Sequence, residues 1–93
     1  CKILPTKVVS SLSLSDCQKI SHFSKVVLRK AIDKGGSSIR DFLNISGDQG
    51  SFQKNFNVYQ RENKKCLKYS CKGTIRKKFI SNRSSFFCNL CQK

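Results

Sequence analysis

Residues 66–93 read CLKYSCKGTIRKKFISNRSSFFCNLCQK, and this stretch decides how the chain folds. It contains two close cysteine pairs, one with a four-residue gap (Cys66 and Cys71) and one with a two-residue gap (Cys88 and Cys91). Structural zinc takes four soft ligands in a tetrahedron, and two cysteines a few residues apart supply two of them from one tight turn. Disulfide bonds and buried free thiols remain alternatives, but the spacing favours zinc. We therefore predict one zinc ion per chain, held by these four cysteines.

The sixteen residues between the two cysteine pairs alternate apolar and basic side chains. β-branched and aromatic residues predict one strand at residues 74–80, and Phe86 and Phe87 predict a return strand at residues 84–88. The polar residues 81–84 (SNRS) predict the turn between these strands. The expected structure is a β-hairpin with the cysteines at its open end and Arg83 at its tip.

The charge of the chain is strongly positive, with 19 Lys+Arg against 5 Asp+Glu and a net charge of +14. Residues 54–93 carry eleven basic residues and one acidic residue, so the charge gathers on the predicted hairpin. Such a surface suits a polyanion, because each phosphate contact releases condensed counterions. Nucleic acid is the first expectation, an anionic membrane surface the second, and a merely solvated cationic face the third.

The length and composition indicate a small piece of protein. The chain has 93 residues, lacks methionine and opens on Cys1, so we expect a fragment or a processed product that forms at most one small domain. No apolar run approaches the ~20 residues that span a bilayer, and we expect a monomer with no membrane partner. Cysteines with zinc spacing indicate a reducing cytosol.

A helix is predicted between Ser13 and the glycine pair 35–36. Ser13 and Asp16 have the spacing of a capping box, and glycine accepts the left-handed conformation that ends a helix. Apolar residues recur at helical spacing between these signals, at Cys17, Ile20, Phe23 or Ser24, Val27, Leu28 and Ala31. We interpret Cys17 as a small core residue and not as a fifth metal ligand, and the single histidine, His22, as a surface or packing residue.

The middle of the chain is less regular. Residues 37–43 predict a short semi-buried piece, and residues 44–51 a polar loop. Residues 52–59 (FQKNFNVY) place three aromatic residues on one face of a predicted two-turn helix. Residues 60–65 predict a basic linker that leads into the first cysteine pair.

Four motifs in this order resemble the C-terminal part of the bacterial formamidopyrimidine-DNA glycosylase family: SLSLSDC (11–17), GGSSIRDF (35–42), GDQGSFQKNFNVYQRE (47–62) and NRSSFFCNLCQK (82–93). The resemblance implies a small α plus zinc-bound β-hairpin fold. Residues 1–62 would form a helical DNA-binding region, a partial helix-two-turn-helix, and residues 63–93 a four-cysteine zinc finger. It also implies that the parent protein is a base-excision repair DNA glycosylase and AP lyase, which removes oxidised purines such as 8-oxoguanine and formamidopyrimidines.

The resemblance further implies a partner, a location and site residues. The partner is damaged double-stranded DNA, and the location is the bacterial cytoplasm, in association with the nucleoid. In this family the arginine at the hairpin tip, here Arg83, enters the minor groove near the lesion. The implied DNA-binding residues are Tyr59, Arg61, Lys64, Lys65 and Arg83, and the loop that encloses the everted base maps onto Gly47, Gly50, Ser51 and Phe52.

The chain departs from the family in one major way. The family's catalytic N-terminal proline and the glutamate after it are absent, since Pro5 follows four other residues. We therefore expect no catalytic residue here and no cleavage by this piece alone. Smaller departures are the four-residue gap of the first cysteine pair and Tyr59-Gln60-Arg61 in place of the family's Tyr-Gly-Arg.

Other functions remain open from the sequence. One is a non-enzymatic zinc-ribbon module that binds nucleic acid, and another is a secreted, cationic, disulfide-bonded peptide that acts on membranes. A third is the endonuclease VIII branch of glycosylases, which prefers oxidised pyrimidines. The GGSSIRDF motif and the Cys-Gln ending favour the oxidised-purine branch.

Overall fold

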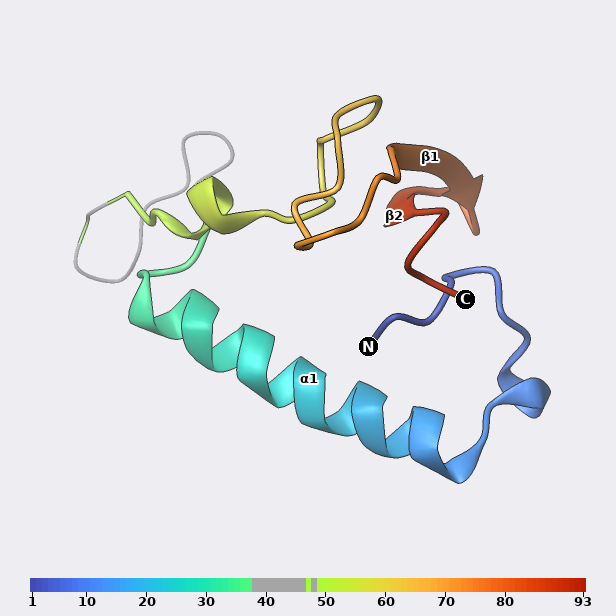
Figure 1. Cartoon of the computed structure of the whole chain (residues 1–93). Coiled ribbons are helices and arrows are strands. Elements are labelled where there is room, and N and C mark those ends of the chain that lie inside the picture. Colours follow the sequence, from blue (N-terminus) through green and yellow to red (C-terminus); the bar gives the residue numbers. More distant parts are fainter. Residues whose placement is uncertain (38–46, 48) are drawn as a thin grey trace.

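The computed structural model describes residues 1–37, 47 and 49–93. In order along the chain, its elements are a 3-10 helix η1 (Val9–Ser11), the helix α1 (Leu14–Asp33), a 3-10 helix η2 (Phe52–Asn55) and the strands β1 (Ile75–Ile80) and β2 (Arg83–Cys88) (Figure 1). One long helix followed by a hairpin confirms the predicted fold class. Most of the semi-buried piece predicted at residues 37–43, most of the GGSSIRDF motif and half of the polar loop predicted at residues 44–51 lie outside the described ranges.

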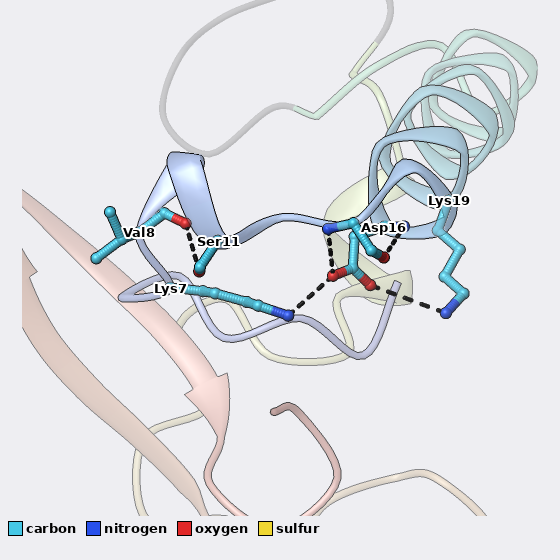
Figure 2. A network of polar contacts seen from close by, with 6 residues as sticks. Lys7, Val8, Ser11, Asp16 and Lys19 are labelled. Carbon is cyan, nitrogen blue, oxygen red and sulfur yellow. Dashed lines mark hydrogen bonds and ion pairs between the residues drawn. The ribbon is translucent and has the colours of Figure 1, made fainter.

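Helix α1 begins and ends where the sequence predicts. The Ser13 side chain accepts a hydrogen bond from the Asp16 amide, and the Asp16 carboxylate accepts one from the Ser13 amide, which completes the capping box. Lys7 Nζ adds an ion pair to Asp16 Oδ2 at 2.8 Å (Figure 2). At the other end Gly35 and Gly36 have φ of 70° and 81°, and their amides bond back to the last turn as in a Schellman motif.

The apolar face of α1 is exposed, so the prediction of Cys17 as a core residue is wrong. Ile20, Phe23 and Val27 are 38%, 41% and 49% exposed. The reason is that, among the described elements, only β1 and β2 contact each other extensively. None of the described helices has the length and apolar character needed to cross a membrane.

The hairpin is tighter than predicted. β1 and β2 pair in antiparallel register from Ile75 opposite Cys88 to Ile80 opposite Arg83. The turn consists of Ser81 and Asn82 alone, and both residues have positive φ (47° and 63°). Two-residue turns with positive φ are common in hairpins because their twist matches the twist of the two paired strands. Arg83 therefore starts β2 and does not lie within the turn, whereas the predicted turn covered residues 81–84.

The core lies at the cysteine end of the hairpin, where Ile75 is 0% and Cys88 1% exposed. The predicted linker 60–65 runs beside this core. The Asn63 amide donates to the Ile75 carbonyl, the Ile75 amide to the Lys64 carbonyl and the Cys66 amide to the Gly73 carbonyl. The two ends of the chain also meet, because the Lys93 amide donates to the Lys2 carbonyl (Figure 1).

The prediction of a two-turn helix at residues 52–59 is wrong. Only Phe52–Asn55 is helical, as one 3-10 turn, and Phe56 already has extended backbone (φ −67°, ψ 123°). So short a helix is marginal by itself. The three aromatic residues instead pack against one another, with ring centroids 5.8 Å apart for Phe52 and Phe56 and 5.3 Å apart for Phe56 and Tyr59.

Candidate metal centre and nucleic-acid interface

The structure brings together the four cysteines that the sequence predicts as metal ligands. Their sulfur atoms all lie within 4.8 Å of one another. Cys66 Sγ is 3.8 Å from Cys91 Sγ, and Cys71 Sγ is 3.7 Å from Cys88 Sγ. Each close contact therefore joins one cysteine of the first pair to one of the second, so the cluster ties residues 66–71 to the end of the hairpin.

These distances fit a tetrahedral metal site. With metal–sulfur bonds of about 2.3 Å, tetrahedral sulfurs lie about 3.8 Å apart. A disulfide needs a sulfur–sulfur distance of about 2.05 Å, and all six cysteines of the chain are free. The cluster could hold a metal ion, with four protein ligands and no position left for substrate.

The surroundings of the cluster give its thiols different pKa values. The pKa of the Cys88 thiol falls to about 7: burial opposes this, but hydrogen bonds from the Cys91 and Leu90 amides favour the thiolate. Burial and then the neighbouring sulfurs raise the pKa of the Cys91 thiol to about 12. The Cys91 thiol therefore stays protonated at neutral pH without a cation, and a bound cation would favour its thiolate form.

Two residues that the sequence analysis did not assign support the cluster. A Cβ atom on Gly73 would lie 2.5 Å from Cys88 Sγ and 2.8 Å from Leu90 Cβ, so only glycine fits beside the sulfurs. Gln92 accepts a hydrogen bond from the Cys88 amide at 2.8 Å and donates one to the Ile3 carbonyl at 3.0 Å. The sequence signal for Gly73 is its place two residues after Cys71, whereas nothing in the sequence pairs Gln92 with Ile3.

The predicted DNA-binding residues lie on or beside the hairpin. Arg83 is exposed at the first position of β2, and Lys64 and Lys65 are exposed along the segment that pairs with residues 73–75. Arg61 is half-buried, and its Nη2 donates to the Lys65 carbonyl at 3.3 Å. Tyr59 is 42% exposed, with its ring against Phe86 of β2 at a centroid distance of 5.2 Å.

The residues assigned to the lesion loop lie mainly at the end of α1. Gly50 is buried, and a Cβ atom there would collide with the Gly36 carbonyl. The Ser51 amide donates to the Lys34 carbonyl and the Phe52 amide to the Gly36 carbonyl, both at 3.0 Å. Gly47, with φ of 81°, is exposed. Hydrogen bonds to the C-terminal end of α1 thus hold residues 50–52 in place.

Comparison of the sequence with known proteins gives a consistent result. The formamidopyrimidine-DNA glycosylase of Hydrogenovibrio crunogenus is 40% identical over 91 residues, which cover 98% of this chain and 32% of that enzyme. The enzyme of Haemophilus influenzae strain PittEE is 42% identical over 93 residues, 100% of this chain and 34% of its own length. The chain thus spans about a third of the length of these curated relatives. No model of a protein family matches the chain.

Solved structures give the same result. The Lactococcus lactis enzyme Fpg in complex with DNA that contains an abasic site superimposes with a TM-score of 0.85, at 34% identity, over 99% of this chain and 33% of the enzyme. The wild-type enzyme bound to DNA with an N7-benzyl-Fapy-dG superimposes with a TM-score of 0.85 at 35% identity, over 99% of this chain and 32% of that enzyme. The chain matches formamidopyrimidine-DNA glycosylases over its full length and corresponds to their C-terminal third, which confirms the resemblance and the fold.

Proposed function

We propose that this chain is the DNA-binding C-terminal third of a formamidopyrimidine-DNA glycosylase, an enzyme that removes oxidised purines from DNA. The match along the whole chain to enzymes of that name carries the proposal. The similarity to enzymes crystallised on abasic-site and formamidopyrimidine DNA and the net charge of +14 support damaged duplex DNA as the partner. A DNA repair enzyme of this kind would act in the bacterial cytoplasm, at the nucleoid.

We further propose that the metal is one zinc ion. Four thiolates in a closed site are the ligand set of structural zinc, and their sulfur separations fit its bond length. Among the described residues, the buried hydrophobic ones are Ile75 and Cys88, which form a very small core. The ion would therefore add stability that this core does not supply. All four ligands come from one chain, so the site forms in a monomer.

The recognition step that these residues would perform follows from the chemistry of base removal. The target base has to leave the helical stack, at a cost of a few kcal/mol, so the protein must hold a distorted duplex. The exposed Lys64 and Lys65 would contact phosphates, which position the protein without reading sequence. Arg83, exposed beside the two-residue turn, would reach into the minor groove, and Gly50, Ser51 and Phe52 would anchor the loop over the everted base.

The chain would supply recognition and not chemistry. In this family the amine of an N-terminal proline attacks the sugar and gives the enzyme its AP lyase activity, and a glutamate assists. Neither group is present in these residues, where Pro5 is preceded by four others. We therefore propose that the full-length enzyme excises the base and cleaves the abasic site, and that the 93-residue chain alone binds DNA without cleaving it.

Zinc analysis and a binding measurement test this function. The purified chain should contain one zinc ion and bind a duplex with an abasic-site analogue more tightly than the undamaged duplex. Arg83→Ala should weaken binding to the abasic-site duplex more than Lys64→Ala, which removes an equal charge. Equal, salt-dependent binding to both duplexes would favour a nucleic-acid module without lesion recognition. Absence of both zinc and DNA binding would contradict the proposal.

A further inference from the structure

The register of the hairpin sorts its cations onto two faces. Residues opposite each other in an antiparallel pair share a face, and alternate residues of a strand share a face. Arg76 pairs with Phe87, Lys78 with Ser85 and Ile80 with Arg83. Three cations, Arg76, Lys78 and Arg83, therefore lie on one face of the two-stranded sheet, and we call them the hairpin cation row.

The other face of the hairpin contacts the rest of the molecule at its cysteine end, whereas Phe79 of this face, near the turn, is 67% exposed. It carries Ile75 and Cys88, which are buried, and Phe86, whose ring packs against Tyr59. The cation of this inner face, Lys77, lies with its Nζ 5.9 Å from the centre of the Phe86 ring. The hairpin cation row lies on the face opposite these contacts, and all three of its residues are exposed.

The charges of the hairpin cation row are uncompensated in the described part of the chain. The two ion pairs there join Asp16 to Lys7 and to Lys19, so neither of them involves a residue of the hairpin. The side chains of Arg76, Lys78 and Arg83 make no hydrogen bond or ion pair with any described residue. Their donors are free for an external anion.

The spacing of the row suits a repeating anion. Alternate residues of a strand lie about 6.8 Å apart, and diagonal neighbours such as Lys78 and Arg83 about 7–8 Å apart. Successive phosphates of one DNA strand advance by about 3.4 Å along the helix axis. Long side chains at this spacing can each reach a different phosphate of the same strand, whereas a single small anion would engage only one or two.

We propose that Arg76 and Lys78 of the hairpin cation row bind phosphates of one strand of duplex DNA, beside Arg83, whose side chain the proposed function assigns to the minor groove. This deepens the proposed function, on which it rests. Arg83 sits at the turn end of the row, so contacts by Arg76 and Lys78 would fix the angle at which the hairpin tip approaches the groove. The affinity they add is independent of sequence and of damage.

The test is the salt dependence of binding of the zinc-loaded chain to undamaged duplex. Each phosphate contact contributes about 0.9 to the slope of log affinity against log salt. The double variant Arg76→Gln/Lys78→Gln should lower this slope by about 1.8, because two contacts are lost. The control Lys72→Gln/Lys77→Gln removes the same charge from one exposed residue before β1 and one inner-face residue of β1, and should lower the slope by less than half as much. Zinc content confirms that each variant is folded.

The outcomes separate the inference from the proposed function. A wild-type chain that carries zinc but binds no duplex would overturn the proposed function and the row together. A wild-type chain that binds duplex, with equal slopes for the two double variants, would overturn the row alone, because the charge would then act without regard to its position. Loss of binding to phosphatidylserine vesicles in the Arg76→Gln/Lys78→Gln variant, with duplex binding unchanged, would also overturn it.

Discussion

Tyr59 and Phe86 meet edge to face, with ring centroids 5.2 Å apart and planes at 75°. Tyr59 is also in edge contact with Phe56, which in turn contacts Phe52. Four rings thus connect Phe52, the last residue assigned to the lesion loop, to the second strand of the hairpin. This aromatic series links the residues assigned to the everted base with those assigned to the minor groove, which are far apart in sequence.

The first prediction concerns this contact. A double-mutant cycle of Tyr59→Leu and Phe86→Leu should give a coupling free energy of about 1 kcal/mol, the usual value for an aromatic pair beyond its buried area. The measurement is urea unfolding of the zinc-loaded chain. Tyr69, which is 94% exposed, is the control, and Tyr69→Leu should not couple to Phe86→Leu. Additive effects of Tyr59→Leu and Phe86→Leu would show that the rings are in contact without being coupled.

The second prediction concerns Gly73. Gly73→Ala would put a methyl group 2.5 Å from Cys88 Sγ and 3.3 Å from Cys71 Sγ, so two ligands would have to move. We expect the zinc affinity to fall by about tenfold or more, which is the usual effect of a mutation next to the metal ligands that disturbs their positions. Competition with a chromogenic chelator measures it. Lys72→Ala, at an exposed position, should leave zinc affinity unchanged, and equal affinity in Gly73→Ala would refute the close fit.

The third prediction concerns Gln60, where the family has glycine. Gln60 has φ of 55°, a left-handed conformation that costs a residue with a side chain about 1–2 kcal/mol. Glycine avoids this cost, but it loses more conformational entropy when the chain folds, which costs about 0.5–1 kcal/mol. Gln60→Gly should therefore raise the free energy of unfolding by about 0.5–1 kcal/mol. Gln60→Ala keeps the strain and should give no gain in the same urea titration.

Much of the metal centre could be predicted from the sequence, because ligand spacing is local: two turns with two cysteines each determine which four sulfurs can meet. The limits of α1 were also predictable, since its capping box and glycines act within a few residues of the helix ends. The exposure of its apolar face could not be predicted. Periodicity identifies which side of the helix is apolar but not what covers it, and Cys17, Ile20 and Val27 are exposed in this chain.

The errors at residues 52–59 and 81–84 have a different cause. Phe52, Phe56 and Tyr59 have helical spacing, but their rings pack in a series that continues to Phe86, more than twenty residues away in sequence. A window of sequence contains no sign of that distant partner. The turn was predicted too long because Ser81 is an unusual residue for a position with positive φ, where asparagine or glycine is expected.

The fourth prediction concerns pH. The ion pair with Lys7 and then the hydrogen bond from the Ser13 amide hold the pKa of Asp16 below its ordinary value. Asp16 thus stabilises the folded chain fully above an ordinary aspartate pKa of about 3.9, and this is lost as pH falls through the lower folded pKa. Asp16→Asn should therefore be less stable than wild type at pH 7, with a difference that vanishes in acid.

Urea titrations followed by circular dichroism at several pH values measure this difference, and the comparison cancels the loss of metal that both chains share. Lys7→Gln should reproduce most of the effect, because Lys7 is the largest influence on Asp16. Lys25→Gln, at an exposed position in the middle of α1, should not. A difference between wild type and Asp16→Asn that persists unchanged below pH 2 would contradict the assignment.

The most direct test of the central claim is a chimera in which this chain replaces the matching third of the Haemophilus influenzae enzyme, with which it shares 42% identity over 93 residues. The chimera supplies the missing catalytic residues. If this chain is the DNA-binding third of such an enzyme, the chimera should carry zinc and excise formamidopyrimidine from duplex DNA, and Cys71→Ala in it should abolish both. A folded, zinc-loaded chimera that neither binds nor cuts the damaged duplex would contradict the claim.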